Sequence, residues 1–113
     1  QSLDSNYYKT YFKYYKANSN YNSALDSINR AISLSNKQKD SLKLEKAIYL
    51  FENNKINETL EEIKILKSIK IEKKGLLEKV LKFEYDLYGK LNEYEMQNNI
   101  TKEIKKYDPT FKK

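Results

Sequence analysis

Apolar residues recur at helical spacing along almost the whole chain, and this pattern constrains the fold more than any other feature of the sequence. One run places six of them on a single helix face: Tyr21, Ala24, Leu25, Ile28, Ala31 and Ile32. The 113 residues include only two glycines and one proline, so helices meet few interruptions and the tight turns of a sheet protein have few residues to form them. The sequence therefore predicts an all-α protein.

Short polar stretches divide this pattern into about six antiparallel helices, which we expect to stack as helix-turn-helix hairpins. The expected hairpins span residues 7–35, 38–70 and 75–107. Asn20 is the expected N-cap of the second helix, Gly75 is expected in the turn before the fifth helix, and Gly89 at that helix's end. We expect residues 1–6 to form a flexible N-terminus, and a chain of this length predicts one domain, 1–113.

Several chemistries are disfavoured by what the sequence lacks. It contains no cysteine and no histidine, which removes disulfides, thiolate and imidazole metal ligands, and the usual pairs of nucleophile and general base. Paired catalytic acids and glycine-rich phosphate loops are not found either. We therefore predict a protein that is not an enzyme and needs no cofactor or metal. No apolar run approaches the length of about 20 residues that a membrane-spanning helix requires.

The net charge of +6 and the pI near 9.3 favour anionic partners in general. The chain starts with a polar stretch, Gln1 to Asn6, which suits the segment that follows an export cleavage site. This start predicts a bacterial exported protein or lipoprotein of the periplasm or cell envelope, with peripheral or lipid-anchored membrane association. A cytoplasmic location is the alternative.

The hairpin crossings repeat along the sequence. Residues 20–25 lie 35 positions before residues 55–60, and Ile28 and Ala31 have counterparts in Ile63 and Leu66 at the same offset. In this respect the chain resembles the tetratricopeptide family. Signature positions of that family are occupied in the first hairpin by Tyr8, Tyr15, Tyr21, Ala24, Ile28 and Ala31, in the second by Ala47, Leu50, Ile56, Thr59, Ile63 and Leu66, and in the third by Tyr88, Tyr94, Ile104 and Asp108–Pro109.

The chain also departs from the family pattern. Phe12 and Tyr85 stand where the family has a small residue, and Lys43 and Lys46 stand where it has apolar ones. The resemblance implies a right-handed superhelical array whose groove receives a peptide or a partner helix. An unrelated helical bundle of similar periodicity is the alternative.

The candidate binding residues lie on the first helix. Lys9, Lys13 and Lys16 share one face, which the resemblance puts on the groove side, and their mutual repulsion would be relieved by an acidic peptide. The opposite face is rich in aromatic rings. Tyr7, Tyr11 and Tyr14 are candidates there for partner binding, and packing on the second helix is the alternative role for these tyrosines.

The predicted function is a protein-protein interaction adaptor, monomeric or weakly homodimeric, that binds a peptide or a partner protein. One alternative is a compact helical immunity or accessory protein. Another is a basic module for nucleic acid or an anionic membrane surface. Nucleic acid is disfavoured because the lysines and the rings lie on opposite faces, whereas base stacking with phosphate contact needs both on one face.

Overall fold

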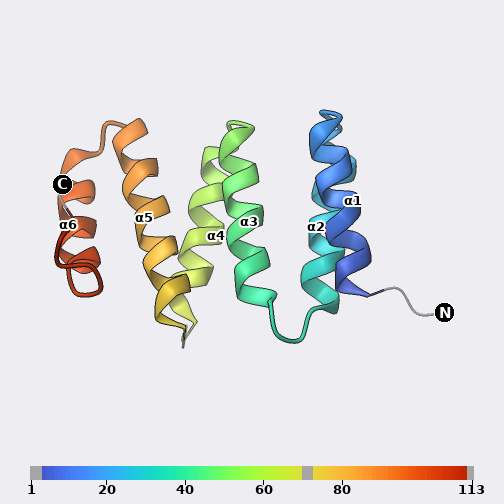
Figure 1. Cartoon of the computed structure of the whole chain (residues 1–113). Coiled ribbons are helices and arrows are strands. Elements are labelled where there is room, and N and C mark those ends of the chain that lie inside the picture. Colours follow the sequence, from blue (N-terminus) through green and yellow to red (C-terminus); the bar gives the residue numbers. More distant parts are fainter. Residues whose placement is uncertain (1–3, 70–72, 112–113) are drawn as a thin grey trace. The chain divides into compact units, whose positions relative to one another are not determined.

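The residues described by the computed structural model, 4–69 and 73–111, fold into six α-helices and contain no β-strand (Figure 1). The helices are α1 Ser5–Ala17, α2 Tyr21–Leu34, α3 Lys39–Glu52, α4 Ile56–Ser68, α5 Lys74–Lys90 and α6 Tyr94–Ile104. The all-α prediction with consecutive helical hairpins is thereby confirmed. Contacts within the chain group it into two compact units, Gln1–Glu62 and Ile63–Lys113. The handedness of the expected superhelix stays a prediction.

The three hairpins turn in the same way. In each turn one residue adopts the left-handed backbone conformation, with φ between 57° and 60°, at Ser19, Asn54 and Asn92. The amide of the following residue donates a hydrogen bond of 2.9 Å to the carbonyl five positions back, from Asn20 to Tyr15, from Lys55 to Leu50 and from Glu93 to Tyr88. This is the Schellman ending of a helix, which satisfies carbonyls that would otherwise lack partners. The turns therefore define which positions of the three hairpins are equivalent: those of the first and second hairpins are 35 positions apart, and those of the second and third are 38 apart. We call this alignment the register.

The first helix begins earlier than the sequence predicts. The Asp4 carboxylate accepts a hydrogen bond of 3.0 Å from the amide of Tyr7, so α1 starts at Ser5 instead of at residue 7. The Ser5 hydroxyl then donates to the carbonyl of Ala31, at 2.9 Å, and ties the start of α1 to α2. Residues 4–6 are thus part of the folded hairpin, whereas residues 1–3 of the expected flexible segment lie outside the described residues.

Other helix ends confirm or correct the predictions. The prediction for Asn20 is confirmed, because its side chain accepts from the amide of Ser23 at 3.3 Å. Gly75 and Gly89 lie within one residue of the two ends of α5, close to the predicted boundaries, but neither has positive φ, so neither supplies the backbone conformation of a turn. Gly89 faces α6, where a β-carbon would come within 2.6 Å of the end of the flexible Gln97 side chain.

The core of the first unit is built where α2 and α3 meet the inner side of α1. Its buried residues are Phe12, Ala24, Ile28, Ala31, Leu42 and Tyr49. The ring of Phe12 meets the edge of the Tyr49 ring with centroids 5.3 Å apart, and Tyr21 stacks on the same ring at 5.6 Å. The first hairpin thus accommodates the large residue at position 12 by turning it toward α3, while the alanines of α2 allow the helices to approach closely.

The second unit contains its own core, in which Leu81, Ile100 and Ile104 are buried. Residues 105–111 follow α6 and place the ring of Phe111 on Tyr85, with centroids 5.1 Å apart in an edge-on arrangement. The Asp108 carboxylate pairs with Lys82 at 3.1 Å. Hydrogen bonds from Thr110 and Lys82 lower the pKa of Asp108. Ring packing and ion pairing therefore hold this final segment against α5.

Candidate functional site

Tyrosines of α1 form a row of rings on the first hairpin, with Tyr7, Tyr11 and Tyr15 in succession. The centroids of Tyr7 and Tyr11 lie 4.9 Å apart, and those of Tyr11 and Tyr15 lie 5.9 Å apart. Because these residues are four positions apart, each ring lies one helical turn from the next. Tyr8 and Tyr15 also pack against the core, whereas Tyr7 and Tyr11 remain 40% and 38% exposed.

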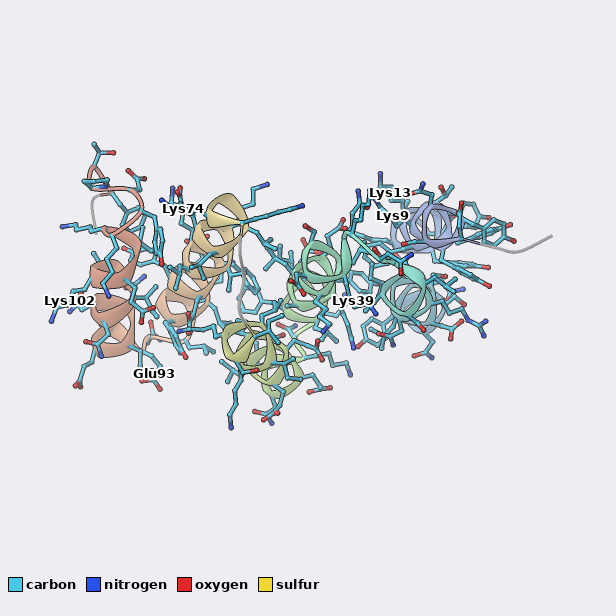
Figure 2. All side chains as sticks on the ribbon, turned by 90° about the horizontal axis from the view of Figure 1, so that it is seen from below. Lys9, Lys13, Lys39, Lys74, Glu93 and Lys102 are labelled. Atoms are coloured by element: carbon cyan, nitrogen blue, oxygen red, sulfur yellow. The ribbon has the colours of Figure 1, made fainter. Side chains whose placement is uncertain are left out.

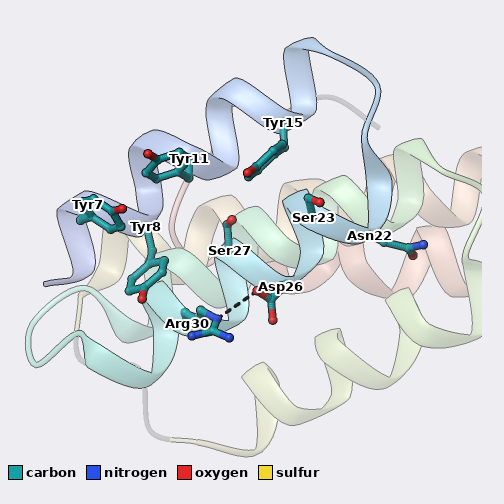
Figure 3. Close-up of a pocket in the computed structure, with 9 residues that line it drawn as sticks. All are labelled: Tyr7, Tyr8, Tyr11, Tyr15, Asn22, Ser23, Asp26, Ser27 and Arg30. Carbon is teal, nitrogen blue, oxygen red and sulfur yellow. Dashed lines mark hydrogen bonds and ion pairs between the residues drawn. The ribbon is translucent and has the colours of Figure 1, made fainter. Parts of the chain in front are cut away.

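The other side of this site comes from α2. Ser23 and Ser27 lie toward the rings, and Asp26 and Arg30 pair beside Tyr8, whereas the Asn22 side chain points away from the rings (Figure 3). Between the two helices lies an open groove of about 580 Å³. We call this side of the hairpin the tyrosine face; its lining residues are Tyr7, Tyr8, Tyr11, Tyr15, Asn22, Ser23, Asp26, Ser27 and Arg30.

The groove continues along α2. A second hollow of about 380 Å³ is lined by Tyr8, Arg30, Ser33 and Leu34, so it shares two residues with the first. The distance along α2 from Asn22 to Leu34 is about 18 Å at the rise of an α-helix. The Leu34 side chain is 45% exposed at the end of this path. An elongated ligand would therefore find contacts along most of the hairpin.

The tyrosine face is close to neutral in a basic chain. Its charged lining residues, Asp26 and Arg30, form an ion pair of 2.9 Å, and the Arg30 guanidinium lies 5.7 Å from the centroid of the Tyr8 ring. Hydrogen bonds to Asp26 and Tyr8 raise the pKa of Arg30. A hydrogen bond with Tyr11 raises the pKa of the Tyr7 hydroxyl, which favours its neutral form. Ligands would meet aromatic carbon and neutral hydroxyls here, without a strong field of either sign.

The predicted lysine residues lie elsewhere on α1. Lys9 and Lys13 lie along one edge of the helix (Figure 2). The Lys9 ammonium donates to the side chain of Gln38 at 3.1 Å, and Lys16 lies 3.8 Å from the carboxylate of Glu52. Lys13 forms no ion pair with any described residue. Two of the three lysines thus have partners around α3, which leaves less free charge for an acidic ligand than the sequence indicates.

The six predicted site residues do not lie on one surface. It brings Tyr7 and Tyr11 together on the tyrosine face, while Tyr14, 58% exposed, packs its ring against Tyr15 with centroids 5.3 Å apart and lies outside the groove lining. Lys9 and Lys16 point to a different side. Their roles in binding stay predictions.

Sequence reasoning missed the contribution of α2. Asp26 and Arg30 occupy positions i and i+4 of one helix, and Arg30 is the only arginine among 22 basic residues. A single arginine in so lysine-rich a chain could have indicated that this position depends on a planar, stacking guanidinium. Its placement against Tyr8 of α1 could be found only from the fold.

Residues 4–69 and 73–111 hold no cluster of three or more acidic side chains that could bind a metal ion. Over the same residues, no helix has the length and apolar character needed to cross a membrane. Each buried polar side-chain atom in this part of the chain has a hydrogen-bond partner.

Comparisons with known proteins add no family to this description. No protein-family model, curated protein or solved structure matches the chain. The molecule is thus defined by its own features, an all-α chain of helical hairpins with an aromatic groove on the first hairpin.

Proposed function

We propose that the chain is a protein-interaction module of tetratricopeptide-like helical hairpins, without enzymatic activity, and that it binds its partner through the tyrosine face. The observation that carries this proposal is the gathering of partly exposed tyrosines along one groove of about 580 Å³. Tyrosine contributes large contact areas at a low cost in side-chain entropy, and it is enriched among residues that dominate binding energy. The similar spacing of the three turns, 35 and 38 positions, supports the repeat class.

The tyrosine face supports this function better than the lysine residues do. Lys9 and Lys16 already contact Gln38 and Glu52. Exposed ion pairs of this kind contribute little binding energy and are screened by salt. The rings, by contrast, offer apolar area that salt does not screen.

A pull-down from an extract of the source organism at moderate salt tests the proposal. The test variant carries Tyr7→Ser, Tyr11→Ser and Tyr14→Ser, all at exposed positions. Tyr94→Ser is the matched control, because Tyr94 is 60% exposed on a different hairpin. We expect one discrete protein to be retained by the wild type and by the control, and to be lost with the triple variant.

A Lys13→Glu variant examines the competing site. If it abolished capture while the tyrosine variant retained the partner, binding would belong to the lysine edge. Recovery of nucleic acid or lipid at low salt alone would support a general basic surface and contradict the adaptor function.

A further inference from the structure

The repeat register gives the tyrosine face counterparts in the other two hairpins. With the offsets of the turns, 35 and 38 positions, Tyr7 is equivalent to Leu42 of α3 and to Val80 of α5. Leu42 is 1% exposed and Val80 is fully buried, whereas Tyr7 is 40% exposed. The position is therefore covered in two hairpins and open in the first.

The first unit shows what covers the equivalent face of the second hairpin. Leu42 packs in one cluster with Ile28 and Ala31 of α2, the second helix of the preceding hairpin. In the second unit the same relation holds for Glu84 of α5, the counterpart of Tyr11, which accepts a hydrogen bond of 2.9 Å from Lys67 of α4. In both units a helix covers this face.

The covering helix has a definite surface. The residues of α2 that enter the cluster, Ala24, Ile28 and Ala31, stand at positions i, i+4 and i+7, and all three are fully buried. Two of them are alanines, whose small side chains let the helix axes approach closely. The tyrosine face has the small residues Ser23 and Ser27 on its α2 side, and it has the length of about two helical turns.

A second copy of the chain does not offer such a helix in its third hairpin, α5 and α6. The counterpart of Phe12 there is Tyr85, and Phe111 already covers its ring at 5.1 Å, as Tyr49 covers Phe12 at 5.3 Å. The counterparts of Ala24 and Ile28 in α6 are polar, Gln97 and Thr101. Head-to-tail stacking of two copies would have to displace Phe111 and bury these polar groups.

We propose that the tyrosine face docks one α-helix of a partner protein, a helix that presents small and β-branched apolar residues at i, i+4 and i+7 and carries net negative charge on its outer side. The apolar stripe repeats the pattern of Ala24, Ile28 and Ala31 of α2, which cluster with Leu42, the counterpart of Tyr7 in the second hairpin. The negative charge follows from the net charge of +6, which attracts an acidic helix at long range although the groove itself is neutral. This inference rests on the proposed function and specifies its partner.

The test uses a synthetic probe with the full chain. The probe is a lactam-bridged helical peptide of about 16 residues, long enough for the groove at about 1.5 Å per residue, with an Ala, Ile, Ala stripe and mostly glutamate elsewhere. A peptide of the same composition with the stripe scrambled is its control. We expect saturable binding of the striped peptide, measured by fluorescence anisotropy, and at least about tenfold weaker binding of the scrambled one.

Two independent variants locate the binding surface. Tyr7→Ser with Tyr11→Ser removes rings of α1, and Leu34→Lys places a charge at the α2 end of the groove; each is expected to weaken binding about tenfold. Tyr94→Ser is expected to bind as the wild type does. Raising the salt from about 100 to 500 mM should weaken binding of both peptides, because the long-range attraction of the glutamates is screened, but the affinity ratio of striped to scrambled peptide should change less than about threefold, because the stripe contacts are apolar. Far-UV circular dichroism checks that both variants remain helical.

Several results would overturn the inference. Equal binding of the scrambled peptide would show that charge alone attracts the probe, and no binding at about 1 mM would remove the helix as occupant. Sedimentation that revealed a dimer dependent on Tyr7 and Tyr11 would make a second copy the occupant. If the peptide failed while the pull-down remained tyrosine-dependent, only the helical nature of the partner would be withdrawn and the proposed function would stand.

Discussion

The register makes Tyr7 and Leu42 equivalent, and their different burial predicts that truncation to alanine lowers the free energy of unfolding much more for Leu42→Ala than for Tyr7→Ala. Leu42 is 1% exposed, so truncation removes three buried carbons, with a transfer cost of about 2 kcal/mol. A cavity that cannot close adds about 1–2 kcal/mol, which brings the expected loss of unfolding free energy to about 3–4 kcal/mol. Alanine favours helices more than leucine does, so helix propensity does not contribute to the loss. Tyr7→Ala should leave the urea midpoint nearly unchanged, because no helix covers that ring.

Urea unfolding followed by circular dichroism at 222 nm measures both effects. With a denaturant slope of about 2 kcal/mol/M, the Leu42→Ala midpoint should fall by about 1.5–2 M. The wild type and Tyr94→Ala, an exposed tyrosine in another hairpin, are the references. A loss below about 1 kcal/mol for Leu42→Ala, or equal midpoint shifts for the two truncations, would refute the assignment of the tyrosine face as the open counterpart of a covered one.

Three further substitutions test other parts of the structure by the same urea assay. Asn54 has a φ of 60°, so Asn54→Gly should be tolerated. Asn54→Ala should lower the unfolding free energy by about 1 kcal/mol, because alanine is strained in the left-handed conformation. Equal stability of both variants would contradict the turn geometry. Phe111→Ala should cost about 1–2 kcal/mol through the lost ring contact with Tyr85, and no loss would show that the final segment does not hold the second unit. Burial raises the pKa of Glu84 above its ordinary value of 4.5 despite the ion pair with Lys67. Protonation of Glu84 therefore stabilises the folded state; this contribution is complete below pH 4.5 and is lost as the pH rises through the folded-state pKa. The wild type should therefore gain stability relative to Glu84→Gln between pH 7 and pH 5, and a constant difference would contradict the shift.

The helical architecture could be predicted from sequence because it depends on local periodicity and on polar breaks. Asn20 illustrates this, since its capping role needs only the residues that follow it. The glycines could not be predicted in the same way. Gly89 lies in the last turn of α5 and faces Gln97 of the next helix, and a contact between two helices cannot be deduced from the spacing of residues in one helix.

The candidate site shows the same limit. The tyrosines and lysines of α1 were separable by helical phase, and the structure keeps them on different sides. Phe12 lies among these tyrosines in the sequence, but the fold turns its ring inward onto Tyr49. Nor could phase show that Lys9 and Lys16 have partners near α3, or that Arg30 meets Tyr8, because these contacts arise only when the helices are assembled.

The ion pair of buried Glu84 with partly exposed Lys67 has a consequence for which helix α5 can pack against. A chain of similar hairpins can dock α5 on the wrong helix, and α2 offers a surface of the same register as α4. The counterpart of Lys67 in α2 is Ile32, so a misplaced α5 would bury the Glu84 carboxylate, only 4% exposed in the native fold, without a cation. Such an unpaired buried charge costs about 3 kcal/mol or more. The ion pair thus favours α4 over α2 as the helix that packs against α5.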